Sequence, residues 1–291
     1  MNTIKTIIVS TLFALSGHTS LAYAEGPPGS EVFVAQLKNN HVEHVFNISN
    51  RIGYDNQPFF SEQGVYFTAA FESNKKWQTE IMFFDFAESQ TKRLTFTPVS
   101  EYSPTLMPNG KTLSAVVVEP DGAQKLWQYP LADMSKAQRL FNDLAPVGYH
   151  AWGKPGELIS FILGQPHSLY LYSIAKQQKQ LLAKDIGRTL HFDSSTQEYS
   201  FSQYHDGHLW VARITKDNVI ARDFALPNGV EYFTKLNSQQ IAFAKKNQVY
   251  VWQSGMLDAQ PWLDLSDFCT TDISRLAYQA KAQRLAFVCA E

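Results

Sequence analysis

The chain has 291 residues, with 25 Lys and Arg against 27 Asp and Glu and a formal net charge of −2. The nearest approach to a basic cluster is the pair Lys75-Lys76. Proteins that bind nucleic acid gather many Lys and Arg residues against the phosphates, so the sequence argues against nucleic acid as a partner. The length exceeds that of a common domain, yet closed all-β folds of this size form a single domain.

The N-terminal residues have the pattern of a secretory signal peptide. Lys5 precedes a short apolar run from Ile7 to Leu15, and the small-residue site Ala22-Tyr23-Ala24 follows. We predict a signal peptide over residues 1–24, cleaved after Ala24, and a periplasmic location. The apolar run is shorter than the roughly 20 residues that span a bilayer, and no Cys lies nearby to accept a lipid, so we expect no membrane anchor. An uncleaved anchor or a buried N-terminal strand is the alternative.

An internal repeat runs through the first half of the chain. Pro58 and Pro104 are 46 residues apart, and the same interval separates Gly64 from Gly110 and Gly110 from Gly156. Alternating apolar residues follow each of these glycines, which is typical of a strand after a turn. The three copies lie at 55–67, 102–113 and 152–161.

The later copies keep only the strand that follows the turn. Each has a triplet of apolar, small and aromatic residues, and the aromatic positions Phe201, Phe243 and Phe287 are separated by 42 and 44 residues. A period of 40 to 50 residues built from short alternating strands is typical of β-propeller blades. Helical repeats do not fit, because β-branched and aromatic residues alternate at period two between Pro, Gly and Asn. The triplets are Tyr199-Ser200-Phe201, Ile241-Ala242-Phe243 and Leu285-Ala286-Phe287.

Five units are complete, and the sixth stops at Cys289, after its second strand. The missing outer half lies near the N-terminus, at Val32–Leu37 and His44–Phe46. Pairing of the two chain ends would close the ring and remove unpaired strand edges. We therefore predict an all-β fold: one six-bladed β-propeller over residues 25–291, with the last blade closed by N-terminal strands.

The sequence has two cysteines, Cys269 and Cys289. In an oxidising compartment such a pair most simply forms one disulfide. Closing a loop of this size would contribute about 3 kcal/mol, and we expect the bond to brace the inner strands of the shared blade. The sequence offers no C-x-x-C motif and no third thiol for a zinc site.

The second copy of the repeat resembles a known family. Ser103–Leu113, continued by Glu119-Pro120-Asp121-Gly122 and Leu126-Trp127, resembles the WD40-like (PD40) repeat of TolB-type propellers. The resemblance covers about residues 31–291 and is closest in the first three units. It implies a periplasmic propeller that binds partner proteins. TolB itself carries a separate N-terminal α/β domain, which we do not expect here, so only the propeller resemblance is carried over.

Polar side chains open each predicted blade, where the innermost strands begin around the central channel. Acids, histidines and tyrosines at six such places could converge on a small polar ligand or a cation, although residues there are also commonly polar because they are solvated. These positions hold Tyr54-Asp55, Glu101-Tyr102, Tyr149-His150, His191, Glu231-Tyr232 and Asp272. All of them except Tyr54 and Glu101 are our candidate ligand contacts. We assign no metal ligand, because His150 and His191 lack a third histidine at an equivalent place.

Two classes of function remain open. The sequence has no nucleophile elbow, phosphate-binding glycine loop or H-E-x-x-H motif. We favour a non-enzymatic envelope module, a monomer without a cofactor, that binds a protein or peptide. The alternative is a small-ligand receptor or a metal-dependent, lyase-like carbohydrate-active enzyme that uses the channel mouth.

Overall fold

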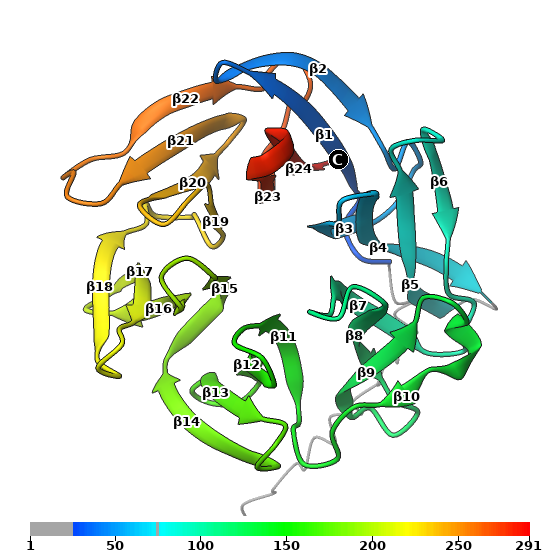
Figure 1. The fold of residues 1–291 in the computed structure, drawn as a ribbon. Coiled ribbons are helices and arrows are strands. Elements are labelled where there is room, and N and C mark those ends of the chain that lie inside the picture. Colours follow the sequence, from blue (N-terminus) through cyan, green and yellow to red (C-terminus); the bar gives the residue numbers. More distant parts are fainter. Residues whose placement is uncertain (1–25, 74–75) are drawn as a thin grey trace, which may run out of the picture.

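The computed structural model describes residues 26–73 and 76–291, so the predicted signal peptide lies outside the described residues. Six four-stranded antiparallel sheets surround a central axis, each forming one blade (Figure 1). The prediction of an all-β, six-bladed propeller is confirmed. In the described part, helical structure is limited to two 3-10 turns, Met134–Lys136 and Ala280–Ala282. No helix in that part is both long and apolar enough to span a membrane.

Within each blade the four strands succeed one another from the channel outward. The first blade comprises β3 (Asp55–Phe60), β4 (Gly64–Ser73), β5 (Lys76–Asp85) and β6 (Gln90–Arg93). The second comprises β7 (Ser100–Leu106), β8 (Thr112–Val118), β9 (Gln124–Pro130) and β10 (Gln138–Arg139). The third comprises β11 (Val147–Trp152), β12 (Glu157–Ile162), β13 (Ser168–Ser173) and β14 (Gln178–Lys184).

The remaining three blades repeat this order. The fourth comprises β15 (Ile186–Asp193), β16 (Glu198–His205), β17 (His208–Ile214) and β18 (Ile220–Ala225). The fifth comprises β19 (Thr234–Lys235), β20 (Gln240–Lys245), β21 (Gln248–Gln253) and β22 (Gln260–Asp264). The sixth comprises β23 (Ile273–Gln279), β24 (Arg284–Ala290), β1 (Ser30–Lys38) and β2 (His41–Asn47).

The second strand of each blade forms much of the core. The central residues of β8 and β24 are buried on both faces of the sheet, because each blade is packed between two neighbours. The aromatic residues of the three sequence triplets, Phe201, Phe243 and Phe287, are at most 1% exposed, as is Phe161 at the end of the third repeat copy. Packing between blades is therefore the physical origin of the repeat.

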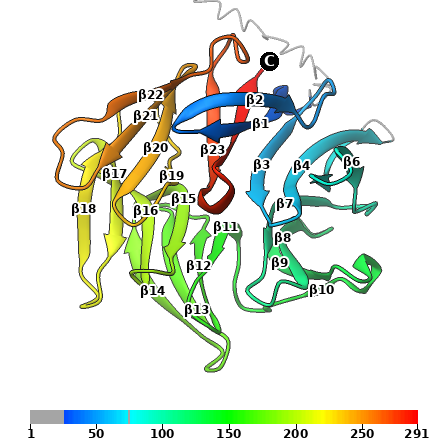
Figure 2. The same cartoon turned by 45° about the horizontal axis from the view of Figure 1, so that its top comes forward.

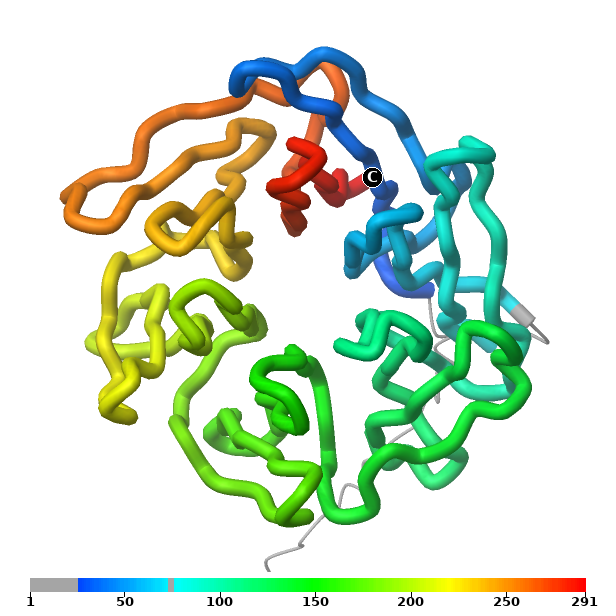
Figure 3. The backbone as a smooth tube through the Cα atoms, viewed as in Figure 1, coloured from blue at the N-terminus to red at the C-terminus, as the bar shows by residue number. Residues whose placement is uncertain are grey.

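The two ends of the chain meet in the sixth blade. Strand β1 lies between β2 and β24, with Phe33 opposite Phe287 and Val34 opposite Ala286. The N-terminal strands lie beside the C-terminal ones in a turned view (Figure 2), and the backbone path shows one circuit of the ring between them (Figure 3). The predicted closure is confirmed.

The repeated glycines have two different structural roles. Gly110 adopts φ +65° in the turn between β7 and β8, as expected for a tight hairpin. Gly64 does not have a positive φ, but a Cβ there would lie 1.9 Å from the carbonyl oxygen of Phe84. Gly64 is therefore required by the close approach of β5.

The predicted disulfide between Cys269 and Cys289 is present, with an S–S distance of 2.08 Å. Cys289 lies in β24, whereas Cys269 lies in the connection between β22 and β23, ahead of the innermost strand. The bond therefore ties the chain arriving from the fifth blade to the second strand of the closing blade. Both cysteines are buried in one cluster with Leu265, Ile273 and Phe287.

Candidate functional site

A cavity of about 540 Å³ occupies the centre of the ring and is lined by residues from all six blades. Its size falls in the range of small-molecule binding pockets. Every innermost strand is followed by the same antiparallel meander, so the six strands run in the same direction along the channel. Residues at the beginnings of these strands therefore share one end of the channel.

Arg275, near the beginning of β23, joins two tyrosines from other blades. Its Nη2 donates hydrogen bonds to the hydroxyl oxygens of Tyr149, at 2.8 Å, and Tyr232, at 2.7 Å. The guanidinium also lies over both rings, 3.8 Å from the Tyr232 centroid and 5.1 Å from that of Tyr149. We call Arg275, Tyr149, Tyr232 and the neighbouring Arg188 the Arg275 cluster.

β-bulges help to position this cluster. The register of β23 shifts between Ile273 and Arg275, and that of β11 shifts between Val147 and Tyr149. A bulge inserts an extra residue, bends the strand and redirects the side chains beside it. These irregularities lie where Arg275 and Tyr149 meet across the channel.

The cavity is unevenly charged. The cations that line it are Arg188, Lys235 and Arg275, and among the described residues no Asp or Glu belongs to its lining. Lys235 pairs with Asp193 at 2.8 Å, and Arg188 contacts Glu231 at 3.4 Å. Within the described ranges, Arg275 forms no ion pair. One positive charge in the cavity is thus left without a counter-charge.

The pKa values of the two tyrosines in the cluster shift in opposite directions. Burial would raise the pKa of Tyr149, but the nearby charges of Arg275 and Arg188 hold it below the usual value. Burial raises the pKa of Tyr232, which therefore keeps its proton at neutral pH. Burial likewise raises the pKa of Tyr54, just before β3, to about 12.

Four of the eight predicted contact residues line the cavity: Tyr149, His150, His191 and Tyr232. Glu231 lies beside it and contacts Arg188 from outside the lining.

The other three candidates, Asp55, Tyr102 and Asp272, are not part of the cavity lining. Asp55 is fully buried and pairs with Arg51 at 2.8 Å, and its burial raises its pKa to about 7. Tyr102 packs against the hydrophobic cluster between the second and third blades. Asp272 is exposed in the connection before β23.

The two channel histidines form part of the wall. His150 Nε2 lies 2.7 Å from the hydroxyl of Ser114, and burial lowers the His150 pKa to about 3, so the ring is neutral. His191 donates from Nε2 to the carbonyl oxygen of Phe233 at 3.0 Å. In the part of the chain that the structure covers, no group of three or more His, Cys, Asp or Glu is placed to hold a metal ion.

The cations of the cavity were not among the predicted contact residues. Those residues are acids, histidines and tyrosines at the blade openings, whereas Arg188 lies three residues before His191 and Arg275 three residues after Asp272. The sequence did contain a signal for these cations. Arg188 and Tyr232 are 44 residues apart, and Tyr232 and Arg275 are 43 apart, so the three residues occupy equivalent positions in successive blades.

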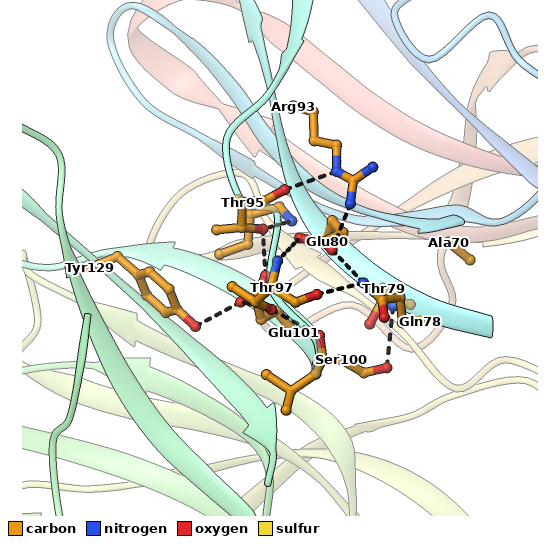
Figure 4. Close-up of polar contacts among 12 residues, drawn as sticks. Ala70, Gln78, Thr79, Glu80, Arg93, Thr95, Thr97, Ser100, Glu101 and Tyr129 are labelled. Carbon is orange, nitrogen blue, oxygen red and sulfur yellow. Dashed lines mark hydrogen bonds and ion pairs between the residues drawn. The ribbon is translucent and has the colours of Figure 1, made fainter. Parts of the chain in front are cut away.

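Glu101, which also opens a blade, belongs to a buried cluster between the first and second blades rather than to the channel (Figure 4). Its carboxylate accepts hydrogen bonds from the hydroxyls of Thr95, Thr97 at 2.8 Å and Tyr129 at 3.0 Å. Burial raises the Glu101 pKa to about 7, although the two threonine bonds lower it in part. Nearby, Glu80 pairs with Arg93 at 2.7 Å.

Solved structures with a similar fold include two TolB proteins. A TolB-type protein from Agrobacterium tumefaciens matches with a TM-score of 0.71 and 10% identity, over 91% of this chain and 99% of that one. TolB from Acinetobacter baumannii matches with a TM-score of 0.61 and 12% identity, over 89% of this chain but 63% of that one. A chain of the nidogen/laminin complex matches with a TM-score of 0.61 and 12% identity, over 90% of this chain and 98% of that one.

These likenesses show the fold: the structural neighbours are TolB-like six-bladed β-propellers. No family model matches the sequence, and no curated protein matches it.

Proposed function

We propose that this protein is an exported binding module of the cell envelope whose central cavity receives a segment of a partner protein or peptide. The observation that carries the proposal is the composition of the cavity wall. Aromatic and proline side chains from several blades surround cations there, without an acid in the lining. Pockets that combine apolar surface with a few placed polar groups are typical of ligand binding.

The two histidines of the same wall are not placed for acid–base catalysis. General acid and base catalysis needs a titratable group free to exchange a proton with a substrate. His150 is neutral and bonded to Ser114, and His191 donates to a main-chain carbonyl. The cations of the cavity can hold an anionic group, but they supply no base near neutral pH. The nidogen/laminin structure is a protein complex by its name, which agrees with a protein partner for a propeller of this shape.

Two features support export. The pattern of residues 1–24 is that of a cleaved signal peptide. The Cys269–Cys289 disulfide suits an oxidising compartment, because cytosolic thiols are kept reduced. We therefore propose a periplasmic location.

Site-specific photocrosslinking in intact cells tests this function. A photoreactive amino acid would replace Tyr278, which lines the cavity, or Phe46, which is 52% exposed on the outer strand β2. We expect Tyr278 to give a crosslinked protein or peptide of defined mass in the periplasmic fraction, and Phe46 to give none. Recovery of the chain in the cytosol, or the same products from both positions, would contradict the proposal.

A further inference from the structure

Arg275 has hydrogen-bonding capacity that the protein does not use. A guanidinium carries five N–H donors, and the two tyrosine hydroxyls both accept from Nη2. Among the described residues, Nε and Nη1 have no acceptor, although Arg275 lines the cavity. Three donors on one planar group therefore remain available to a ligand.

The surroundings of Arg275 compensate its charge only in part. The two tyrosine rings provide cation–π contacts, which stabilise a cation through the negative face of the ring. A neutral tyrosine carries no negative charge, and a partly buried cation without a counter-charge is unfavourable. The Tyr232 hydroxyl donates to that of Tyr149, so the Tyr149 hydroxyl keeps a proton that it can donate to an anion. The site thus combines N–H and O–H donors around an unbalanced charge.

Arg188 adds a second cation to the same place. It lies beside the Tyr232 hydroxyl, and this contact raises the pKa of Arg188. Its ion pair with Glu231 is long, at 3.4 Å, and both side chains are about half exposed. Exposed pairs of this kind contribute little, so Arg188 can turn toward a ligand at low cost.

We propose that the Arg275 cluster binds a carboxylate group of the ligand in the central cavity. Both pairs of parallel N–H groups on a guanidinium include Nη2, which the two tyrosines occupy. The carboxylate would therefore accept one charged hydrogen bond from Nε or Nη1 of Arg275 and a second from Arg188 or the Tyr149 hydroxyl. One unbalanced positive charge also matches the single negative charge of a carboxylate. The group belongs either to the C-terminus of a partner peptide, which rests on the function proposed above, or to a small organic acid.

The test compares acids with their uncharged amides on the purified protein. N-acetylated tripeptides randomised at all three positions would be offered with a free C-terminal carboxylate or a C-terminal amide, beside a pool of acetate, succinate and benzoate. Retention would be measured by mass spectrometry. We expect at least one free-acid pool to be retained about tenfold or more over its amide or over buffer, the effect of a charged hydrogen bond.

Variants assign the effect to the cluster. Arg275→Gln should lower acid retention by about tenfold or more, and Arg275→Lys should lower it by less, because it keeps the charge but loses the planar group. Arg284→Gln is the matched control: Arg284 belongs to the same blade but bonds Gln36 and lies over Phe86, outside the cavity. Acid retention should be unchanged in this variant. Circular dichroism would verify that each variant is folded.

The outcomes separate this inference from the proposed function. Equal retention of acids and amides by the wild-type protein, or retention of neither acid pool, would overturn the carboxylate site even if Arg275→Gln failed to fold. A photocrosslinked partner recovered despite that result would leave the proposed function standing. Retention of the small acids alone would support the site and assign the carboxylate to a free acid.

Discussion

Phe33 of β1 stacks on Phe287 of β24, with ring centroids 5.1 Å apart and planes 8° from parallel. The two residues are paired in register, yet they come from opposite ends of the chain. Phe287 is fully buried, so the stack connects the first strand to the core of the sixth blade. Closure of the ring therefore depends on aromatic packing as well as on main-chain hydrogen bonds.

Removing this stack should destabilise the protein. We expect Phe33→Ala to lower the free energy of unfolding by about 2–3 kcal/mol, somewhat less than for a fully buried phenylalanine. Phe46→Ala on the adjacent strand is the control, and because that side chain is 52% exposed it should change stability by less than about 0.5 kcal/mol. Urea denaturation followed by tryptophan fluorescence measures both. Equal losses for the two variants would show that the stack has no special role.

Deleting residues 31–47 should have a larger effect. The deletion removes nearly all of β1 and β2, which leaves β24, whose central residues are buried, without its outer partner. An unpaired apolar edge promotes aggregation, so we expect no cooperative unfolding transition and a strong loss of soluble protein. Differential scanning calorimetry measures the transition. A truncated protein that melts as cooperatively as the intact one would contradict the closed-ring architecture.

The disulfide should contribute about as much to the free energy of unfolding as a large buried side chain does. Replacing both Cys269 and Cys289 by Ser should lower the free energy of unfolding by about 3 kcal/mol, because the unfolded chain is no longer constrained over the intervening loop. A reducing agent should lower the stability of the wild-type protein and leave the double variant unchanged. A loss caused by the reducing agent in the double variant as well would point to an effect unrelated to this bond.

The fold could be predicted from the sequence because its repeat reflects packing. Blades contact one another through the same buried aromatic position, so Phe201, Phe243 and Phe287 retain the period even where the turn residues change. The location of the missing half-blade followed from counting strands. Both inferences rest on short-range patterns that every blade must satisfy.

The site was harder to predict because bulges shift the innermost strands. Gln57 and Ser103 have φ of +59° and +53°, and they lie within register shifts of β3 and β7. A shift of one residue moves a side chain to the other face of a strand. Asp55, just before the first of these shifts, is buried beside Arg51, away from the cavity. A repeated proline follows each shifted residue, but it does not show which face the preceding side chains take.

Gly64 and Gly110 allow two costs of adding a side chain to be compared: a clash with a neighbouring strand and a strained backbone conformation. Gly64→Ala should destabilise the protein more than Gly110→Ala, although only Gly110 has a positive φ. The new Cβ at residue 64 would lie 1.9 Å from the Phe84 carbonyl oxygen, whereas nothing lies within 4 Å of that position at residue 110. We expect about 1–2 kcal/mol for Gly110→Ala, the cost of a left-handed conformation, and a larger loss for Gly64→Ala. Chemical denaturation decides the order, and the reverse order would contradict the proposed role of Gly64.

The buried carboxyl of Glu101 should make stability depend on pH. Its pKa is about 7 in the folded protein, above the ordinary value of 4.5, so the unfolded chain releases this proton more readily. The free energy of unfolding should therefore fall as pH rises from about 4.5 to about 7, by at most about 3 kcal/mol from this group, and the contribution should be constant above that range.

Glu101→Gln tests this dependence, because the amide retains a hydrogen-bond acceptor but does not titrate. We expect a shallower fall between pH 4.5 and 7, with a residual slope from Asp55, whose pKa is also raised to about 7 by burial. The control is Glu62→Gln, at a surface pair with Lys281 where the carboxylate side chain is 76% exposed, and it should leave the slope unchanged. Urea denaturation across the pH range measures all three proteins. An unchanged slope in Glu101→Gln would mean that Glu101 is ionised in the folded protein throughout this range.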